Sequence, residues 1–362
     1  MEILRPAGCS RCEVLPEAVA GPGRLFLWFP VRHGQARAAR RLGDLGHSHR
    51  LLPDGDGLVV EFQGKEVFEL ARALAAQLGP EEAHDTRTLW MKGPEDPGFS
   101  DFPRVTSLSR FVATGRASWL RGLLGERRIT SHFQPIVQAA DTSSVFGHEA
   151  LLRGFEEDET PVPPGRIFAA ARDADLLFQV DLAARQSAIR QAVQHNLRTR
   201  IFINFSPASI YDPAYCLRST VAAIADSGLP PYLIVFEVME SERVDDLSHL
   251  ESILAVYRQA GFRVALDDLG AGYSSLTLMS RIRPDFVKLD RELIRQVDRD
   301  SYKAVIAEKL LELARQLKIR VIAEGVETPG ELAWLQARRA DYIQGFLIAP
   351  PSAEPLRHPP RM

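Results

Sequence analysis

The sequence predicts an α/β protein: a modified (β/α)8 TIM-type barrel with one antiparallel strand, preceded by a small α+β domain of ferredoxin-like order. Three observations lead to this fold class. The chain has 362 residues, enough for a barrel of about 250 residues and a second domain. From residue 131 onward, short apolar runs alternate with amphipathic helical patterns, which is typical of strands in a closed parallel sheet. Before residue 92 the pattern follows the order β-α-β-β-α-β, which is typical of a ferredoxin-like sandwich.

The N-terminal segment, residues 1–20, contains Cys9 and Cys12 in a C-x-x-C spacing. This spacing is compatible with half of a zinc site, with a redox pair, or with two ordinary reduced thiols. A zinc site needs further ligands, and His47 and His49 are the candidates nearby. The sequence leaves these three alternatives open.

The small α+β domain is expected over residues 21–92. Apolar runs and turn residues predict, in order, the strand RLFLWFPV, the helix QARAARRLGDL, two strands within HRLLPDGDGLVVEF, the helix KEVFELARALAAQL and the strand RTLWM. Such units commonly sense ligands or form dimers, so we expect this domain to regulate the second one. Residues 93–115 concentrate Pro, Gly, Ser and charge, which predicts a linker.

The barrel is expected over residues 116–356. Its eight predicted strands are 131–137, 145–153, 200–206, 233–238, 263–268, 285–290, 320–325 and 342–346. The loop QAADTSSV between the first two strands is too short for a parallel crossover. We therefore expect these two strands to pair antiparallel.

Composition excludes several classes of protein. A formal net charge of −3 gives no electrostatic footprint for duplex nucleic acid. No apolar run approaches the ~18 residues that span a bilayer, and the N-terminus lacks the apolar region of a signal peptide. Three cysteines do not imply a disulfide framework. We expect a cytoplasmic protein with no membrane span.

Polar side chains gather at the ends of the predicted barrel strands. Carboxyl ends of barrel strands meet at one rim, which carries the active site in this fold, so we expect these side chains to share one mouth. They are Glu149, Arg153, Asn204, Glu237, Asp267, Asp268, Lys288, Asp290, Glu324, Glu327 and Gln344. One such residue alone is usually a cap or half of an ion pair, and a lone Asp-Asp pair is usually a solvated loop. A set spread over seven successive strands is not explained in that way.

The oxygen atoms of this set indicate a site for divalent cations. Carboxylate and amide oxygens favour Mg²⁺ or Mn²⁺ over zinc or copper. Two such ions ~3.5–4 Å apart would clamp a phosphate and activate a water. Lys288 would orient that water or stabilise charge on the phosphoryl oxygens. The chemistry predicts metal-assisted hydrolysis of a phosphoryl group.

At these residues the sequence resembles the EAL-type cyclic di-GMP phosphodiesterases. The tripeptide that names the family stands at Glu149-Ala150-Leu151. The other motifs follow in the family's order and spacing: FQPIV (133–137), INFSP (203–207), FEVMESE (236–242), ALDDLGAGYSSL (265–276), PDFVKLD (284–290), VIAEGVET (321–328) and YIQGF (342–346). The resemblance implies hydrolysis of cyclic di-GMP to linear pGpG with two Mg²⁺ or Mn²⁺ ions per active site. It also implies a homodimer formed through the barrel.

The resemblance implies roles for individual residues. Those that would hold metal are Glu149, Asn204, Glu237, Asp267, Asp268 and Glu324, with Asp268 bridging to or holding the second ion. Lys288 would contact the attacking water, and Glu149 and Glu324 would act with it in catalysis, Glu324 as general base. Those that would contact the dinucleotide are Gln134, Arg153, Asp290, Glu327 and Gln344. Glu240 would anchor the loop after the fifth strand.

Three positions depart from the family's usual motifs. Met239 replaces a threonine in the strand-four motif, and Leu269 and Ala271 replace a phenylalanine and a threonine after the paired aspartates. These changes bear on rate and metal affinity. The alternatives to an enzyme are a catalytically silent cyclic di-GMP receptor that signals to a protein partner, and a protein-binding module that uses no nucleotide.

Overall fold

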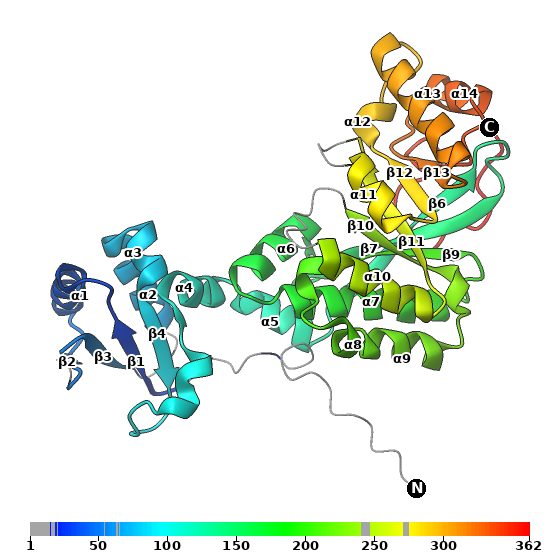
Figure 1. The fold of residues 1–362 in the computed structure, drawn as a ribbon. Coiled ribbons are helices and arrows are strands. Elements are labelled where there is room, and N and C mark those ends of the chain that lie inside the picture. Colours follow the sequence, from blue (N-terminus) through cyan, green and yellow to red (C-terminus); the bar gives the residue numbers. More distant parts are fainter. Residues whose placement is uncertain are drawn as a thin grey trace, which may run out of the picture. The chain divides into compact units, whose positions relative to one another are not determined.

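The computed structural model describes residues 21–53, 55–62, 64, 66–239, 247–270 and 275–362, together with Leu15 and Val19. The described residues form two compact units (Figure 1). The small unit runs from Leu15 to Glu126 and includes Gly165–Leu177, and the barrel unit comprises Arg127–Pro164 and Phe178–Met362.

The small unit contains the predicted β-α-β-β-α-β order, with one short helix added before the last strand. Its elements are β1 (Gly23–Trp28), α1 (Arg32–Asp44), β2 (His49–Leu51), β3 (Gly57–Phe62), α2 (Glu66–Leu78), α3 (Pro80–Asp85) and β4 (Arg87–Met91). All strand pairs are antiparallel, in the order β2-β3-β1-β4-β5. The first four strands therefore follow the ferredoxin-like arrangement.

The structure differs from the predicted linker at residues 99–116. This stretch forms η1 (Phe99–Arg104), β5 (Thr106–Ser107) and α4 (Leu108–Arg116). β5 extends the sheet by pairing with β4. Phe111 on α4 packs against Phe68 on α2, with their ring centroids 5.1 Å apart. The apolar residues of α4 lie on one face of the helix and pack into the same buried cluster as α1 and α2. This stretch therefore belongs to the small unit. Two further helices of this unit are α5 (Ser118–Gly125) and α6 (Pro164–Asp173).

The predicted barrel with one antiparallel strand is confirmed. Its strands are β6 (Ile129–Gln138), β7 (Val145–Phe155), β9 (Arg200–Asn204), β10 (Ile234–Met239), β11 (Arg263–Leu269), β12 (Phe286–Leu289), β13 (Arg320–Ala323) and β14 (Tyr342–Ile343). They follow the order β6-β14-β13-β12-β11-β10-β9-β7, and the pairing of β6 with β7 closes the ring. β6 runs antiparallel to both of its neighbours, whereas the other neighbours in the ring pair parallel. The two-residue β8 (Pro161–Val162) pairs with β7 outside the ring.

Helices cover the outside of this ring. They are α7 (Leu177–Gln194), α9 (Arg218–Ser227), α10 (Leu247–Gln259), α11 (Ser275–Ile282), α13 (Ser301–Gln316) and α14 (Pro329–Ala337), with the shorter η2 (Pro207–Ser209), α8 (Pro213–Cys216), η3 (Pro231–Leu233) and α12 (Arg291–Ile294). Their apolar faces and the outward side chains of the strands form the largest buried cluster. In that cluster Phe236 on β10 stacks on Tyr257 of α10, with ring centroids 3.9 Å apart.

The inside of the barrel has two layers. The lower layer is apolar and consists of Ile136, Phe202, Val235, Ala265, Phe286 and Ile322, with Phe146 and Tyr342 against it. Side chains two residues apart on a strand share a face. For six residues of the lower layer, the residue two positions later in the strand direction is polar. These pairs are Phe202 and Asn204, Val235 and Glu237, Ala265 and Asp267, Phe286 and Lys288, Ile322 and Glu324, and Tyr342 and Gln344. In the reversed β6, Gln134 instead precedes Ile136. The apolar layer thus forms the floor of a polar mouth.

The last described residues fasten the first barrel strands. Phe133 and Ser352 exchange two backbone hydrogen bonds, with N···O distances of 2.7 and 3.1 Å. The carbonyl oxygen of Leu356 lies 3.0 Å from Nε2 of His148, and the Thr142 hydroxyl donates to the carbonyl of Pro360 at 3.0 Å. Residues 352–360 therefore tie β6, β7 and the loop between them.

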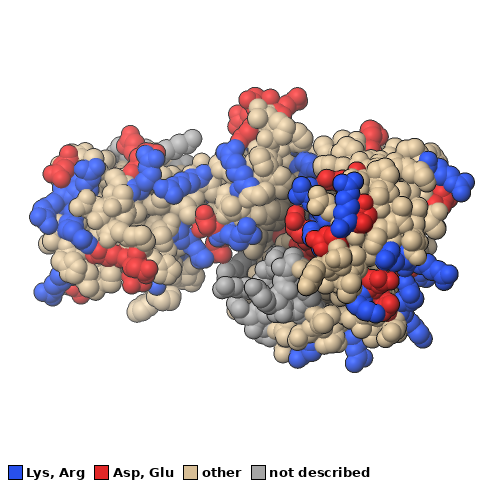
Figure 2. Space-filling model, turned by 90° about the horizontal axis from the view of Figure 1, so that it is seen from above, with Lys and Arg blue, Asp and Glu red and all other residues tan. Residues whose placement is uncertain are grey.

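The surface carries charge of both signs. On the face drawn in Figure 2, Lys and Arg side chains are interspersed with Asp and Glu rather than gathered in a field of one sign. Among the described residues, none of the helices combines the length and the apolar character needed to cross a membrane.

A substitution at Gly147 tests the packing of the lower layer. A Cβ at this position of β7 would lie 2.9 Å from the ring of Phe202 and 2.9 Å from the carbonyl oxygen of Arg200. We expect Gly147→Ala to lower the free energy of unfolding by about 1–3 kcal/mol, because a packed core resists added volume. Urea unfolding of the full chain measures this. The control Gly165→Ala, with no atom within 4 Å of the new Cβ, should change it by less than about 1 kcal/mol. Equal stability of the two variants would contradict the packing argument.

Candidate active site

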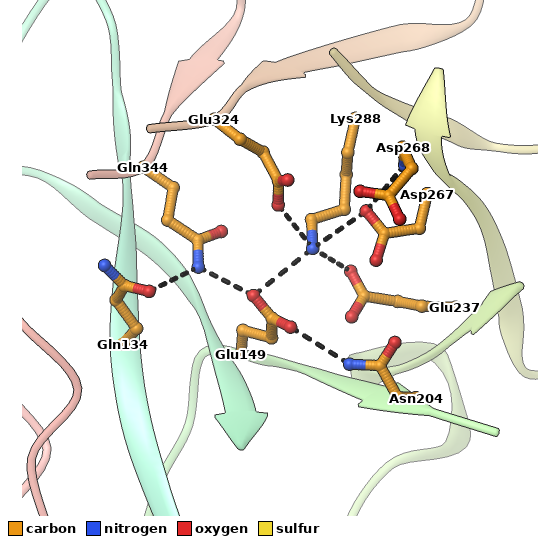
Figure 3. Close-up of polar contacts among 9 residues, drawn as sticks. All are labelled: Gln134, Glu149, Asn204, Glu237, Asp267, Asp268, Lys288, Glu324 and Gln344. Carbon is orange, nitrogen blue, oxygen red and sulfur yellow. Dashed lines mark hydrogen bonds and ion pairs between the residues drawn. The ribbon is translucent and has the colours of Figure 1, made fainter. Parts of the chain in front are cut away.

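Lys288 lies at the centre of the barrel mouth (Figure 3). Its Nζ atom lies 2.6 Å from Oε1 of Glu324, 2.9 Å from Oε1 of Glu237, 3.2 Å from Oε2 of Glu149 and 3.3 Å from Oδ1 of Asp267. The Lys288 side chain is 1% exposed, and the most exposed of the four carboxylates, Glu324, is 17% exposed. One ammonium therefore faces four largely buried carboxylates.

The paired aspartates reach the same mouth because β11 is irregular. In a regular strand Asp267 and Asp268 would point to opposite faces. The pairing register with β12 shifts between Leu266 and Leu269, where β11 has one residue more than its partner. Asp268 adopts a φ of +58°, a left-handed conformation that aspartate tolerates better than most residues. As a result Asp268 is half-buried beside Asp267, and its backbone N–H donates to Oδ1 of Asp267 at 3.0 Å.

Three amide side chains line the same mouth. Nδ2 of Asn204 donates to Oε1 of Glu149 at 3.0 Å, and Nε2 of Gln344 donates to Oε2 of Glu149 at 2.7 Å. The same Gln344 nitrogen lies 3.0 Å from Oε1 of Gln134, whose own amide donates to the carbonyl of Ala349. These hydrogen bonds fix the orientation of Glu149.

The surroundings of Lys288 and Glu149 favour the charged form of each side chain. Burial alone would lower the pKa of Lys288, but the carboxylates of Asp267, Glu149, Glu237 and Glu324 raise this pKa well above its usual value. Burial would raise the pKa of Glu149, yet Lys288 and the hydrogen bonds from the amides hold that pKa below its usual value.

The remaining carboxyl groups hold protons more tightly. Burial raises the pKa of Glu237 and of Glu324 well above their usual values, and the neighbouring carboxylates add to the rise. The pKa of Asp268 is raised to about 6, first by burial and then by the charges of Asp267 and Asp290. Repulsion between these groups is therefore only partly offset by Lys288.

The oxygen atoms fit the needs of hard divalent cations. Carboxylate oxygens of Glu149, Glu237 and Asp267 lie within 4.8 Å of one another, as do those of Asp267, Asp268 and Glu324. Asp267 belongs to both groups and links them. Among the described side chains, Oε2 of Glu237 and Oδ1 of Asn204 are buried without a hydrogen-bond partner. Buried oxygens of this kind are costly unless a ligand meets them, so these residues fit a pair of Mg²⁺ or Mn²⁺ ions.

Other predicted site residues lie outside this cluster. Arg153 is half-buried on the same face of β7 as Glu149, and its Nη1 donates to the carbonyl of Leu152 at 2.7 Å. Asp290 caps α12 by accepting the N–H of Glu292 at 2.8 Å. Glu327 pairs with Arg291 at 2.9 Å rather than joining the carboxylates. The predicted anchor Glu240 lies outside the described residues, as do Ala271, Cys9 and Cys12.

One buried ion pair that supports the mouth was not predicted. Asp181 and Arg185 on α7 are joined by nitrogen–oxygen distances of 3.0 and 2.7 Å. Asp181 also accepts the backbone N–H of Ser206 at 2.9 Å and the hydroxyl of Ser209 at 3.0 Å. It therefore holds the loop that follows Asn204. The signal in the sequence was an Asp and an Arg four residues apart on the apolar face of a helix.

Glu331 is a second residue that was not predicted. It is 2% exposed and accepts the backbone N–H groups of Gln296, Glu327 and Thr328 at 2.8–3.0 Å. Thr328 in turn caps α14 through the N–H of Glu331. This capping box fixes the loop that leads from Glu324. The T-x-x-E spacing before an apolar run was its signal in the sequence.

One of the three departures from the family motifs, Leu269, lies away from the carboxylates. Leu269 is 1% exposed and belongs to the outer apolar cluster, so its side chain packs between the sheet and the helices. Met239 ends β10 two residues after Glu237.

Comparisons with known proteins place the barrel in one family. The EAL domain family matches residues 117–351. The cyclic di-GMP phosphodiesterase NbdA of Pseudomonas aeruginosa is 30% identical over 236 residues, which are 64% of this chain and 30% of NbdA. The chain matches 29–31% of the length of the first three curated relatives.

Solved structures show the same fold. A standalone EAL protein from Vibrio cholerae, in its c-di-GMP-bound form, is 35% identical with a TM-score of 0.58, covering 64% of this chain and 95% of that one. BlrP1 of Klebsiella pneumoniae, in a manganese/cy-diGMP complex, is 25% identical with a TM-score of 0.57, covering 91% of this chain and 96% of that one. The family match covers more than half of the chain. The chain belongs to the EAL domain family.

Proposed function

We propose that this chain hydrolyses cyclic di-GMP to linear pGpG in a reaction that depends on two Mg²⁺ or Mn²⁺ ions. The observation that carries the proposal is the mouth itself, where four carboxylates surround the buried Lys288. Family membership and the phosphodiesterase relatives support the substrate. No metal-binding position of the family motifs is replaced in this sequence.

The two carboxylate groups of the mouth would hold one ion each. Glu149, Asn204, Glu237 and Asp267 surround the first position, and Asp267, Asp268 and Glu324 the second. When bound, the ions would neutralise charge on the phosphate and activate a water for attack. Asp267 would tie the two positions together, a role that the sequence suggested for Asp268.

Lys288 and Glu324 would act directly on the water. The raised pKa of Lys288 keeps its ammonium charged, so its N–H groups can donate to the water or to a phosphoryl oxygen. Glu324 lies 2.6 Å from that ammonium, and its carboxylate would accept the proton that the water loses.

The rim would recognise the dinucleotide. Gln134 and Gln344 present amide groups beside Glu149, and the guanidinium of Arg153 suits a phosphate or a guanine edge. Asp290 and Glu327 are further contacts proposed from the family. Glu327 would reach the substrate only by leaving Arg291, because these two side chains pair at 2.9 Å.

Three broader features are also part of this proposal. The small unit would regulate the barrel, the protein would work in the cytoplasm, and two barrels would form a homodimer. Leu276 on α11 is 55% exposed, which supports a dimer surface at the helix that follows the β11 loop. Tyr302 and Val305 on α13 are also exposed apolar side chains.

An activity assay tests the proposal. Purified protein with Mn²⁺ should convert cyclic di-GMP to pGpG. Glu149→Ala and Lys288→Met should each lower kcat/KM by about 100-fold or more, because the first removes a ligand of the metal pair and the second removes the positive charge beside the reacting phosphate. Asp226→Asn, on the exposed surface of α9, is the matched control and should change kcat/KM by less than about twofold. Tight binding of cyclic di-GMP without turnover would support the silent receptor instead. If the protein neither binds nor hydrolyses cyclic di-GMP with metal present, both the phosphodiesterase and the receptor are contradicted.

Metal binding should depend on pH in a defined direction. The folded-state pKa of Asp268, about 6, lies above its ordinary value, so its ionised form destabilises the metal-free fold as pH rises through about 4 to 6. Cations relieve that repulsion. Mn²⁺ should therefore raise the Tm more at about pH 7.5 than at about pH 5, measured against EDTA by differential scanning calorimetry. Asp268→Asn should shrink this difference and Asp226→Asn should not. An equal Mn²⁺ shift at both pH values would contradict the assignment.

A further inference from the structure

The small unit contains two hollows that share a wall. The first, of about 430 Å³, has an apolar floor that includes Trp28, Leu89 and Val105. The second, of about 550 Å³, is lined by charged and hydroxyl side chains on α3, β5 and α4. Arg87 and Val105 line both. All of these residues belong to the small unit, so the two hollows are a feature of that unit alone.

The rim of the apolar hollow exposes two aromatic side chains. Phe99 is 102% exposed and Phe102 is 78% exposed, both on η1. Leaving a side chain of this size in water costs about 1.5–3 kcal/mol relative to burying it. A ligand that covers these rings would recover part of that free energy, and the volume suits a small organic molecule.

The second hollow has more cationic than anionic side chains. Arg87, Arg110 and Arg116 line it, against the single carboxylate of Asp173. Arg110 pairs with Asp175 at 3.3 Å, but within the described part of the chain neither Arg87 nor Arg116 has a carboxylate partner. Hydroxyl groups of Thr106, Ser107 and Ser109 add hydrogen-bonding capacity. A wall of this composition favours an anionic group, since guanidinium groups bind phosphate, sulfonate and carboxylate well.

The position of Arg87 joins the two properties. Arg87 opens β4 opposite Ser107, and its side chain shares a face of the sheet with Leu89, two residues on. An anion held by Arg87 would thus carry any attached apolar body toward Leu89, Trp28 and Phe99. We infer that the small unit binds an organic anion with an apolar or aromatic body, the body in the apolar hollow and the charge on Arg87. That such binding would alter hydrolysis rests on the proposed function.

Binding of a matched pair of probes to the full-length chain tests the inference. The anionic probe is 1-anilinonaphthalene-8-sulfonate, and the neutral probe is 1-anilinonaphthalene, which has the same rings without the sulfonate. Fluorescence titration should show saturable binding of the anionic probe with one site. Arg87→Gln should lower the affinity for the anionic probe by about fivefold or more and the affinity for the neutral probe by less than about twofold. Phe99→Ser should weaken both probes.

Two controls keep the result specific. Arg40→Gln removes an exposed arginine on α1, outside both hollows, and should change neither affinity. Glu149→Ala should also leave both affinities unchanged, which excludes binding in the barrel mouth. Arg116→Gln should repeat the effect of Arg87→Gln more weakly and guards against a folding defect in a single variant.

The remaining outcomes overturn the inference. If Arg87→Gln weakens the binding of both probes equally, Arg87 does not bind the anionic group. If neither Arg87→Gln nor Phe99→Ser changes the affinities, the probes do not bind at this site. If Phe99→Ser changes the oligomeric state while both probes bind as before, the apolar rim contacts a second copy of the chain instead. Because these readouts need no turnover, failure of the cyclic di-GMP assay would leave the result for this site standing.

Discussion

The arrangement of four buried carboxylates around one buried ammonium is the constraint on which the barrel mouth depends. Burying any of these groups alone would cost several kcal/mol, and removing one partner of such a set leaves the others uncompensated. Lys288 offers one positive charge to four carboxyl groups, and the raised pKa values of Glu237 and Glu324 reflect the repulsion that it leaves uncompensated. The surrounding hydrogen bonds hold this unfavourable arrangement in place: the amides of Asn204 and Gln344 fix Glu149, and Asp181 and Glu331 secure the adjoining loops. Asp181 and Glu331 thus hold the site together without a proposed part in the chemistry, whereas Asn204 and Gln344 would serve in both ways.

Most of this arrangement could be predicted from the sequence because it follows from the period of a β-strand. A strand that places an apolar residue inside the barrel places its second neighbour on the same face, as with Phe286 and Lys288 or Val235 and Glu237. The residues of the mouth could be named because they stand at the ends of successive predicted strands and in motifs that resemble those of the family. The same period fails at Asp267 and Asp268, where regular alternation would have turned one carboxylate outward. A β-bulge is set by backbone conformation and by pairing with β12, and the sequence alone does not reveal the register of that pairing.

The other differences between prediction and structure have a similar origin. The stretch 99–116 has the composition of a linker, yet three apolar residues of α4 bury against α2, and tertiary packing outweighs composition there. Asp181 acts on Ser206, which lies 25 residues away in the chain, so its role depends on a contact that local patterns do not show. The metal pair, the substrate and the regulatory unit remain proposals that rest on the site geometry together with the family.

The fastening of β6 by the end of the chain has a consequence for how the protein is made. One edge of β6 pairs with β14, and Phe133 pairs with Ser352, which follows it by 219 residues (352 − 133). During synthesis the small unit, whose sheet pairs mostly nearby segments, can collapse as it emerges, whereas the barrel has to wait for its final strand before the ring closes. Until then β6 has a free edge that invites mispairing with other strands. A chain that ended before residue 342 would therefore have a folded small unit and an open, aggregation-prone sheet.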